Sequence, residues 1–348
     1  MEEYTIIGGG ISGLTLAYKL LYKGYSVRLI EAVYPGHAAT GHSAGIIVLQ
    51  LPEDLIDFAL ESIRFYTKIS EGGGYIVNKG AILISRSKGC MNELQRIFQD
   101  RGLTFRYIDW VEAEELTGVK LNIADDEYIA FIDEYLVDVG EIVSRLYRLI
   151  ENLGGTITID KRATLPRRGT VIVAAGPWTP RIIPEIRKSV IVYRCQATVY
   201  EAPKPSVIIE DDVNDFYAVT HPGGELIAGN GENKVLSDPA EGFTPDPWEQ
   251  YLILERYSRR VKDAEHGYPV KTWSAPCIVG KDSKPLVGKV RENIYVVTGL
   301  NGAGITLAGG LAKILIDNIE SGTRIPPSLR PDRPMPEADK PPEPYDTC

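Results

Sequence analysis

Three glycines at the spacing Gly-x-Gly-x-x-Gly stand near the start of the chain, at Gly8, Gly10 and Gly13. They follow a short apolar run at residues 4–7 and open a segment with leucines at helical spacing. This pattern predicts a strand, a tight turn and a helix. Such a turn lets the backbone approach a pyrophosphate, whose charge is stabilised at the N-terminus of the helix. The sequence therefore predicts a dinucleotide site.

An acidic residue stands at the end of the second predicted strand. Residues 26–30 are mostly apolar and end on Glu31, so that residues 4–31 form a complete βαβ unit. The Glu31 carboxylate is placed to accept hydrogen bonds from ribose hydroxyls. Because a carboxylate repels a 2′-phosphate, the pattern argues against NADP.

Metal-ligating residues are scarce. The chain has 4 Cys and 4 His, and only His37 and His42 lie close together. No Cys-x-x-Cys spacing occurs, so we expect neither a zinc site nor a dense disulfide framework. The expected metal content is none.

Length and composition exclude several classes of protein. At roughly 150 residues per domain, 348 residues predict two domains, and the net charge of −9 argues against nucleic acid as a partner. We expect no membrane span, because no apolar window reaches the ~18 residues required. The start Met1-Glu2-Glu3 lacks the basic region of a signal peptide, so we expect a cytoplasmic protein. The low Met and high Tyr content favours a thermostable one.

The elements that position these residues fall into two groups. Residues 170–174 and 293–298 are apolar runs typical of parallel strands buried on both faces. Helices are predicted at residues 55–70, 139–152 and 305–319. Strands of an antiparallel sheet are predicted at 81–85, 105–108, 128–132, 190–200, 206–209, 216–219 and 225–228, with helices at 91–101 and 248–260. Between residues 77 and 132 we expect one helix.

Five stretches resemble the D-amino-acid oxidase family of flavoproteins, of the glycine oxidase and sarcosine oxidase type. They are the glycine turn at 8–13, the small-residue loop Ala-Thr-Gly-His-Ser-Ala-Gly at 39–45, the acidic stretch at 133–138 before a helix, the strand at 171–178 together with Arg194-Cys195-Gln196, and the segment 273–319 with Gly-Leu-Asn-Gly-Ala-Gly-Ile at 299–305. Their order is the family's order, and they span most of the chain.

The resemblance implies an α/β fold, or α+β with two domains: a Rossmann-like doubly wound FAD-binding domain and an antiparallel-sheet substrate domain. The FAD-binding domain is expected at residues 1–76, 137–188 and 274–330, the substrate domain at 77–136 and 189–273, and a Pro-rich tail at 331–348. FAD is the implied cofactor. The residues expected to bind it are Gly8, Gly10, Ile11, Ser12, Gly13, Glu31, Ala32, Thr40, His42, Ser43, Ala44, Gly45, Ala175, Gly176, Trp178, Gly302, Ala303, Gly304 and Ile305.

The sequence departs from the family in its substrate pocket. In a count without gaps, the arginine that holds the substrate carboxylate in amino-acid oxidases falls on Cys277, and Gly302 occupies a position that holds an arginine in some relatives. A bidentate grip on a carboxylate is therefore missing at this place. We expect weak activity on glycine and D-alanine and better activity on a secondary or bulkier amine. Tyr217, His221, Cys277 and Asn301 are the expected pocket residues.

Two residues raise the question of covalent flavin. His42 lies where some relatives carry a histidine joined to FAD, and the cysteine attachment site of sarcosine oxidases falls on Ala275. If His42 is not joined to FAD, we expect it to pack against the flavin or to hydrogen-bond to a carbonyl. Cys277 is interpreted as an apolar lining residue, a thiol near the flavin or an attachment point. We expect noncovalent FAD.

The expected function is oxidation of the C–N bond of an amine or amino acid by hydride transfer to flavin N5, with no certain catalytic side chain. The expected partners are the small-molecule substrate and O₂ or another electron acceptor, and a homo-oligomer is left open. Three alternatives stay open: a 2-hydroxy-acid or polyol dehydrogenase with His221 as base, an FAD-bearing subunit of a larger redox complex, and a nicotinamide-dependent dehydrogenase.

Overall fold

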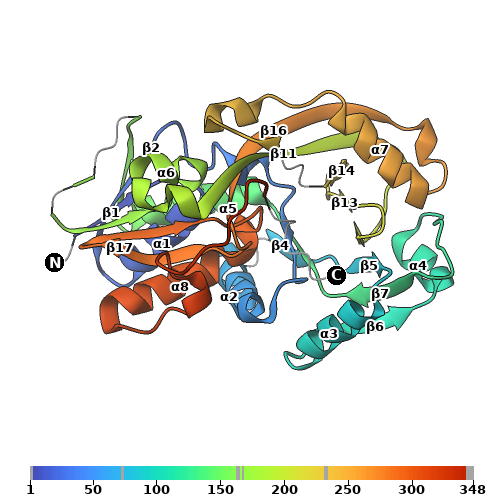
Figure 1. Ribbon diagram of the computed structural model, residues 1–348, viewed down its shortest axis with the longest axis horizontal. Helices are drawn as coiled ribbons and strands as arrows, with labels where there is room; N and C mark the ends of the chain where they lie inside the picture. Colours follow the sequence, from blue (N-terminus) through green and yellow to red (C-terminus); the bar gives the residue numbers. More distant parts are fainter. Residues whose placement is uncertain (1–2, 72–73, 162–164, 167, 231–233, 342–348) are drawn as a thin grey trace.

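The computed structural model describes residues 3–71, 74–161, 165–166, 168–230 and 234–341. Its first sheet has the strand order β17-β18-β10-β1-β2-β9, in which neighbouring strands are parallel except for the β17–β18 pair. The strands are β1 (Glu3–Ile7), β2 (Ser26–Glu31), β9 (Thr156–Ile159), β10 (Thr170–Val173), β17 (Leu286–Arg291) and β18 (Ile294–Thr298). Figure 1 shows this sheet beside the helices that cover it.

Continuous apolar runs explain why β1 and β10 lie in the middle of this sheet. Ile6 and Ile172 face a core shared with the helices, whereas Ile7 and Val173 face a second core on the other side. All four side chains are buried. The predicted βαβ unit is confirmed, since β1 and β2 are parallel neighbours joined by a helix.

Helices cover both faces of this sheet unequally. One face is covered by α1 (Ile11–Tyr22), α2 (Glu53–Ser70), α5 (Val139–Asn152) and α8 (Gly304–Ser321). Glycines in α8 let it approach α2 closely, because a Cβ at Gly310 would lie 2.5 Å from the Phe58 backbone. The other face is covered by the short α6 (Thr179–Ile182) and η3 (Pro184–Ser189). The predicted α/β architecture is confirmed.

The second sheet has the order β15-β11-β14-β13-β12-β5-β7-β6, and β16 also pairs with β11. Its strands are β5 (Ala81–Ser85), β6 (Phe105–Ile108), β7 (Tyr128–Ile132), β11 (Val190–Glu201), β12 (Ile208–Asp211), β13 (Phe216–Thr220), β14 (Leu226–Gly229), β15 (Lys234–Val235) and β16 (Tyr268–Gly280). The pairs are antiparallel except for β5–β12, which is parallel. Helix α7 (Glu249–Arg260) packs on its outer face, and β11 and β16 run side by side toward that helix in Figure 1.

A small third sheet joins the two halves. It consists of β3 (Ile46–Ile47), β8 (Tyr135–Val137) and β4 (Ile76–Asn78), in the order β3-β8-β4. Strand β8 leads into α5, which begins after its N-cap Asp138, whose side chain accepts a hydrogen bond from the Glu141 N–H. The predicted bounds of the helix at residues 139–152 are confirmed.

A second helix, α4 (Trp110–Thr117), follows α3 (Lys88–Gln99), so the expectation of one helix between residues 77 and 132 is wrong. The expected domain boundary at 273/274 falls inside β16.

Residues 322–341 contain one described 3₁₀ turn, η6 (Pro327–Leu329), and are anchored by buried Leu329 and by the Arg333–Asp282 ion pair at 2.7 Å. The tail beyond residue 341 lies outside the described residues. Among the helices described, none is long and apolar enough to cross a membrane.

Candidate functional site

A cavity of about 1340 Å³ reaches from the β1–α1 turn to strands β12 and β13. Ligand pockets for drug-sized molecules typically measure about 300–1000 Å³, so this volume suits a dinucleotide together with a second, smaller molecule. Residues of both large sheets line it. The two sequence motifs at opposite ends of the chain, around Gly10 and Gly304, therefore meet at one site.

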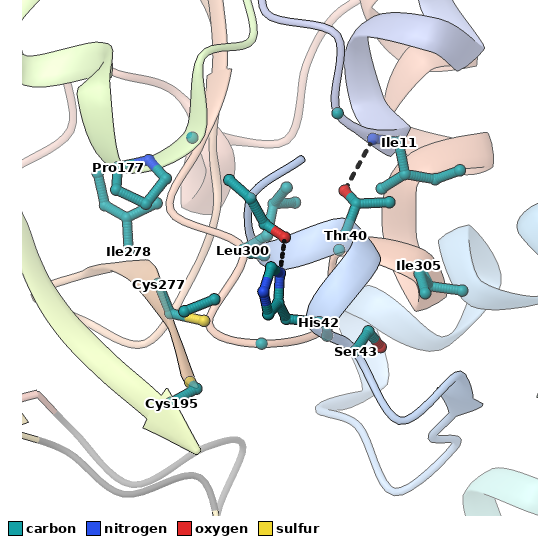
Figure 2. Close-up of a pocket in the computed structure, with 18 of the residues that line it drawn as sticks. Ile11, Thr40, His42, Ser43, Pro177, Cys195, Cys277, Ile278, Leu300 and Ile305 are labelled. Atoms are coloured by element: carbon teal, nitrogen blue, oxygen red, sulfur yellow. Dashed lines mark hydrogen bonds between the residues drawn. The ribbon is translucent and has the colours of Figure 1, made fainter. Parts of the chain in front are cut away.

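The β1–α1 turn depends on two glycines. A Cβ at Gly13 would lie 1.8 Å from the Gly8 carbonyl oxygen, and one at Gly8 would lie 2.3 Å from the Ala174 carbonyl oxygen. Gly8 also has a φ of +111°, which L side chains rarely adopt. The Ile11 N–H donates to the Thr40 hydroxyl at 3.0 Å, so the predicted loop at residues 39–45 lies against the start of α1. Figure 2 shows this hydrogen bond.

The Glu31 carboxylate is held by backbone donors. Its Oε2 accepts from the Gly9 N–H at 2.6 Å, and its Oε1 accepts from the N–H groups of Ala32 and Val33 at 2.7 and 3.0 Å. These bonds fix the carboxylate at the edge of the cavity that it lines. The geometry suits the predicted contact with ribose hydroxyls.

Most of the residues expected to bind the cofactor line the cavity. Gly13 and Gly45 do not line it, and both instead allow close packing: a Cβ at Gly45 would lie 2.4 Å from the Val137 carbonyl oxygen. The expected residues that line it are Gly8, Gly10, Ile11, Ser12, Glu31, Ala32, Thr40, His42, Ser43, Ala44, Ala175, Gly176, Trp178, Gly302, Ala303, Gly304 and Ile305.

His42 belongs to the 3₁₀ turn η1 (Ala39–His42) and is anchored on both sides. Its Nδ1 lies 2.9 Å from the Ala38 carbonyl oxygen, which can only accept, so Nδ1 carries the proton. Its own carbonyl accepts from the Trp273 indole N–H at 2.8 Å. The ring also packs against Phe243 from η4 (Pro239–Phe243), which in turn contacts His37 and Trp178. This aromatic cluster joins segments that are far apart in the chain, so no local pattern predicts it.

The predicted glycine-rich turn at residues 299–304 leads into α8, and the start of this helix lies at the cavity. The side chain of the buried Asn301 accepts a hydrogen bond from the Tyr193 hydroxyl at 3.0 Å. The backbone N–H of Asn301 donates to the Ile278 carbonyl. Gly302, Gly304 and Ile305 follow at the wall of the cavity. The N-terminus of this long helix therefore faces the cavity and favours negative charge there.

Strands β11 and β16 present two thiols to the cavity. Tyr193 pairs with Cys277 and Cys195 with Ala275, so the four side chains share one face. A hydrogen bond with Cys195 raises the pKa of the Cys277 thiol, and burial raises it further. In Figure 2 the two cysteines lie on one side of the pocket, with Thr40, His42 and Ser43 on the other. Cys277 is thus a neutral lining residue.

Tyr217 on β13 lines the cavity, and its strand neighbours leave space for its ring. It pairs with Glu210 on β12 and Gly229 on β14, and a Cβ at Gly229 would lie 2.8 Å from the Tyr217 hydroxyl oxygen. Burial raises the pKa of this tyrosine. His221 lies outside the cavity lining, where its Nε2 is 2.9 Å from the Ala44 carbonyl oxygen. The structure does not bring His221 together with the other pocket residues.

Sequence reasoning missed the acidic side of the cavity. Gln50, Glu210 and Asp212 line it, and the buried Glu134 bonds to Gln50. These residues come from segments far apart in the chain, without a motif to connect them. Within the part of the chain that the structure describes, no group of three or more His, Cys, Asp or Glu could hold a metal ion.

Two curated relatives match most of the chain. It is 23% identical over 360 residues to 4-methylaminobutanoate oxidase (formaldehyde-forming) of Paenarthrobacter nicotinovorans. The match covers 91% of this chain and 43% of the oxidase. It is 35% identical over 375 residues to a Bacillus subtilis protein described as "Putative Rieske 2Fe-2S iron-sulfur protein YhfW", and the match covers 91% of this chain and 68% of that protein. The chain spans less than half the length of the methylaminobutanoate oxidase.

The fold is shared with a solved structure of L-proline dehydrogenase from P. horikoshii. The TM-score is 0.82 at 19% sequence identity, covering 93% of this chain and 94% of that one. Residues 3–318 match the family described as "DAO: FAD dependent oxidoreductase". This match includes the glycine turn, Glu31 and most of α8. The chain therefore belongs to the DAO family of FAD-dependent oxidoreductases, and its cofactor is FAD.

Proposed function

We propose that this protein oxidises the C–N bond of an amine, with FAD as hydride acceptor and with a substrate other than a small amino acid. The observation that carries the proposal is the substrate side of the cavity. Tyr217, Cys277 and Asn301 line it as neutral groups, and no arginine or lysine of the substrate sheet lines it among the residues described. A carboxylate would find no bidentate cation there.

The residues present fit FAD. Gly8 and Gly13 let the β1–α1 turn pack closely against its own backbone and Ala174, which places the N-terminus of α1 at the cavity, where it would stabilise a pyrophosphate. Glu31 stands at the ribose position, and α8 begins at the far end of the same cavity. Gly302 has no atom within 4 Å of a Cβ built on it, so the backbone of this turn is open toward the cavity. The volume accommodates a dinucleotide and a substrate.

The chemistry that FAD supplies when bound is acceptance of a hydride from the carbon next to nitrogen. The chain's own residues bind and orient the substrate. Tyr217 and the side chains of β11 and β16 that line the cavity form the wall against which the substrate would lie. Apolar surroundings disfavour an ammonium, so the reacting nitrogen is held in its neutral form. No side chain needs to act as a base.

Two rivals differ in their support. A hydroxy-acid dehydrogenase needs a base near the substrate, and His221 lies outside the cavity lining. An FAD-bearing part of a larger redox assembly is favoured by the identity to the iron-sulfur protein. Purification under mild conditions tests that second candidate, because a stable redox partner would co-purify with the chain.

Anaerobic reduction of the FAD-loaded protein tests the proposal. The panel includes secondary amines, sarcosine, proline, glycine, D- and L-amino acids and 2-hydroxy acids. We expect an amine to bleach the visible flavin absorbance and the hydroxy acids to leave it unchanged. Bleaching by hydroxy acids alone would replace the proposal with the dehydrogenase alternative.

The attachment of FAD is tested by acid precipitation. We expect the yellow colour to leave the pellet of the wild-type protein, because Ala275 provides no thiol at the position of the cysteine attachment site. His42→Ala is the control. Colour that stays with the wild-type pellet and leaves the His42→Ala pellet would establish a covalent link.

Substrate choice is tested at Cys277. A buried carboxylate without a charged partner loses about 3 to 5 kcal/mol, so glycine and D-alanine should turn over poorly in the wild type. Cys277→Arg should lower the KM for D-alanine about tenfold or more, whereas Cys277→Ala, which removes the thiol without adding charge, should not. A wild-type KM for glycine or D-alanine well below millimolar would show that another cation holds the carboxylate.

A further inference from the structure

Two cysteines of neighbouring strands lie against each other in the wall of the cavity. Cys195 is on β11 and Cys277 is on β16, and both line the cavity. Cys195 pairs with Ala275 and Cys277 with Tyr193, so the two cysteines are diagonal neighbours on one face of the sheet. Cys195 also packs against the buried cluster that contains Cys277, and Figure 2 shows both on the same side of the pocket. Two sulfur atoms are therefore presented together to a molecule in the cavity.

Both cysteines are free thiols, but they are not equivalent. Cys277 is 8% exposed, whereas Cys195 is partly exposed. The hydrogen bond between the two side chains raises the pKa of Cys277, and burial raises it further. A hydrogen bond that raises the pKa of a thiol stabilises its protonated form, so the Cys277 S–H donates to the Cys195 sulfur. Cys195 is thus the more accessible sulfur, and Cys277 lies behind it within hydrogen-bond distance.

The register of the two strands does not suit a direct disulfide between these cysteines. Diagonal neighbours of an antiparallel pair have Cα atoms about 7–8 Å apart, whereas a disulfide usually needs about 4.4–6.8 Å. Closing the bond would pull on the β11–β16 pairing, which continues on both sides of the two cysteines. A single atom bonded to both sulfurs keeps them further apart than a disulfide does, so it spans the pair with less movement of the strands.

The surroundings limit which element can take this place. Among the residues that the structure describes, no group of three or more His, Cys, Asp or Glu could hold a metal ion, so the pair offers two sulfur ligands alone. A structural zinc ion takes four protein ligands. Trivalent arsenic is a soft element that forms three bonds, and it suits soft thiolate ligands. Two of its bonds can go to the cysteines while the third substituent lies in the cavity of about 1340 Å³.

We propose that Cys195 and Cys277 form a two-thiol binding site for trivalent arsenicals. Cys195 reacts first because it is the more exposed: an As–S bond replaces an As–O bond, and the thiol proton leaves with the hydroxide as water. Cys277 then forms the second As–S bond in the same way, from a position that is already in place and so at a high effective concentration. The arsenic stays trivalent, and neither thiol is oxidised. This inference goes beyond the proposed function and does not depend on it.

Retention of phenylarsine oxide by the FAD-loaded protein tests the inference. After incubation and gel filtration, the arsenic bound per chain is measured in excess 2-mercaptoethanol, which has one thiol, and in dithiothreitol, which has two. We expect one arsenical per chain to remain in 2-mercaptoethanol and to be released by dithiothreitol. A protease digest of the loaded protein should contain the Cys195 peptide joined through arsenic to the Cys277 peptide.

Variants separate two-thiol binding from reaction at a single cysteine. Cys195→Ser and Cys277→Ser each remove one thiol with little change in side-chain volume. Each should release the arsenical into 2-mercaptoethanol about a hundredfold or more faster than the wild type, because a single As–S bond remains. Thr272→Ser is the matched control, since it makes a small change on β16 and keeps both thiols. It should release the arsenical at the wild-type rate.

The outcomes distinguish this inference from the proposed function. Equal release rates for the wild type and both cysteine variants, or a digest in which arsenic does not join the Cys195 and Cys277 peptides, would overturn the two-thiol site while amine oxidation stands. The peptide map of the wild-type protein decides the question even if a variant fails to fold. Retention through both cysteines in a protein whose flavin no amine reduces would support the two-thiol site and overturn the proposed function.

Discussion

Gly13→Ala should yield a protein that no longer retains FAD. The added Cβ would lie 1.8 Å from the Gly8 carbonyl oxygen, which is backbone and cannot move aside without opening the β1–α1 turn. That turn holds the N-terminus of α1 at the cavity and positions the Gly9 N–H on Glu31. The measurement is the ratio of visible flavin absorbance to protein absorbance after reconstitution with FAD.

Gly89→Ala is the matched control for this substitution. Gly89 lies in α3, and no atom lies within 4 Å of a Cβ built there. The control should retain a wild-type amount of flavin. A Gly13→Ala protein with a full complement of FAD would show that the close packing of this turn is dispensable.

Arg260→Met should lower the free energy of unfolding by about 3 to 5 kcal/mol, because it leaves buried carboxylates without their cation. The Arg260 side chain is 1% exposed, and its Nε and Nη1 lie 2.6 Å from Asp211 Oδ2 and Glu127 Oε2. Those carboxylate side chains are themselves 0% and 4% exposed. Urea unfolding of both proteins measures the difference.

The loss should depend on pH in a definite direction. Burial alone raises the pKa of Glu127, but the hydrogen bonds from Arg260 and the Ala124 N–H, together with the charges of Arg260 and Arg86, outweigh it and hold that pKa below the ordinary value of 4.5. A carboxyl group with a lowered folded pKa contributes stability above its unfolded pKa and loses it as the pH falls through the folded one. The gap between the wild type and Arg260→Met should therefore be full at neutral pH and shrink below pH 4.5.

A neighbouring arginine on the same helix provides the control. Arg256 is 29% exposed and pairs with Asp215, which is 56% exposed. Solvent weakens such a pair, so Arg256→Met should cost less than about 1 kcal/mol. Equal losses for Arg256→Met and Arg260→Met would contradict the importance assigned to the buried pair.

Local sequence patterns predicted the elements with strong periodicity. The strand, turn and helix around Gly10 and the helix Val139–Asn152 follow from apolar spacing and from an N-cap aspartate. The helix α4 was not predicted, because it is short and keeps Trp110 and Val111 exposed. Strand β16 was not predicted either, because Pro269 and Pro276 interrupt its pattern.

The two sides of the candidate site also differ in how far the sequence predicts them. Its cofactor side consists of contiguous motifs, so most of the expected residues lie at the cavity. Its acidic side is assembled by the parallel pairing of β5 with β12 and by the small sheet whose strand β8 begins directly after Glu134. Such pairings between distant segments leave no local trace, and Glu134 and Glu210 each look like ordinary surface glutamates in the sequence.

The long ribbon of β11 and β16 has a consequence for how ligands are selected. The two strands pair from Val190 and Gly280, next to the core of the first sheet, to Glu201 and Tyr268 beside α7. Rotating one half of the molecule against the other would break backbone hydrogen bonds of this ladder, which has one register shift, between Val199 and Tyr200. The spacing between the two walls is therefore set during folding rather than by domain closure. The cavity is then preorganised for the ligand that it selects. Most of the conformational entropy lost on binding is lost by the flexible ligand and not by the protein.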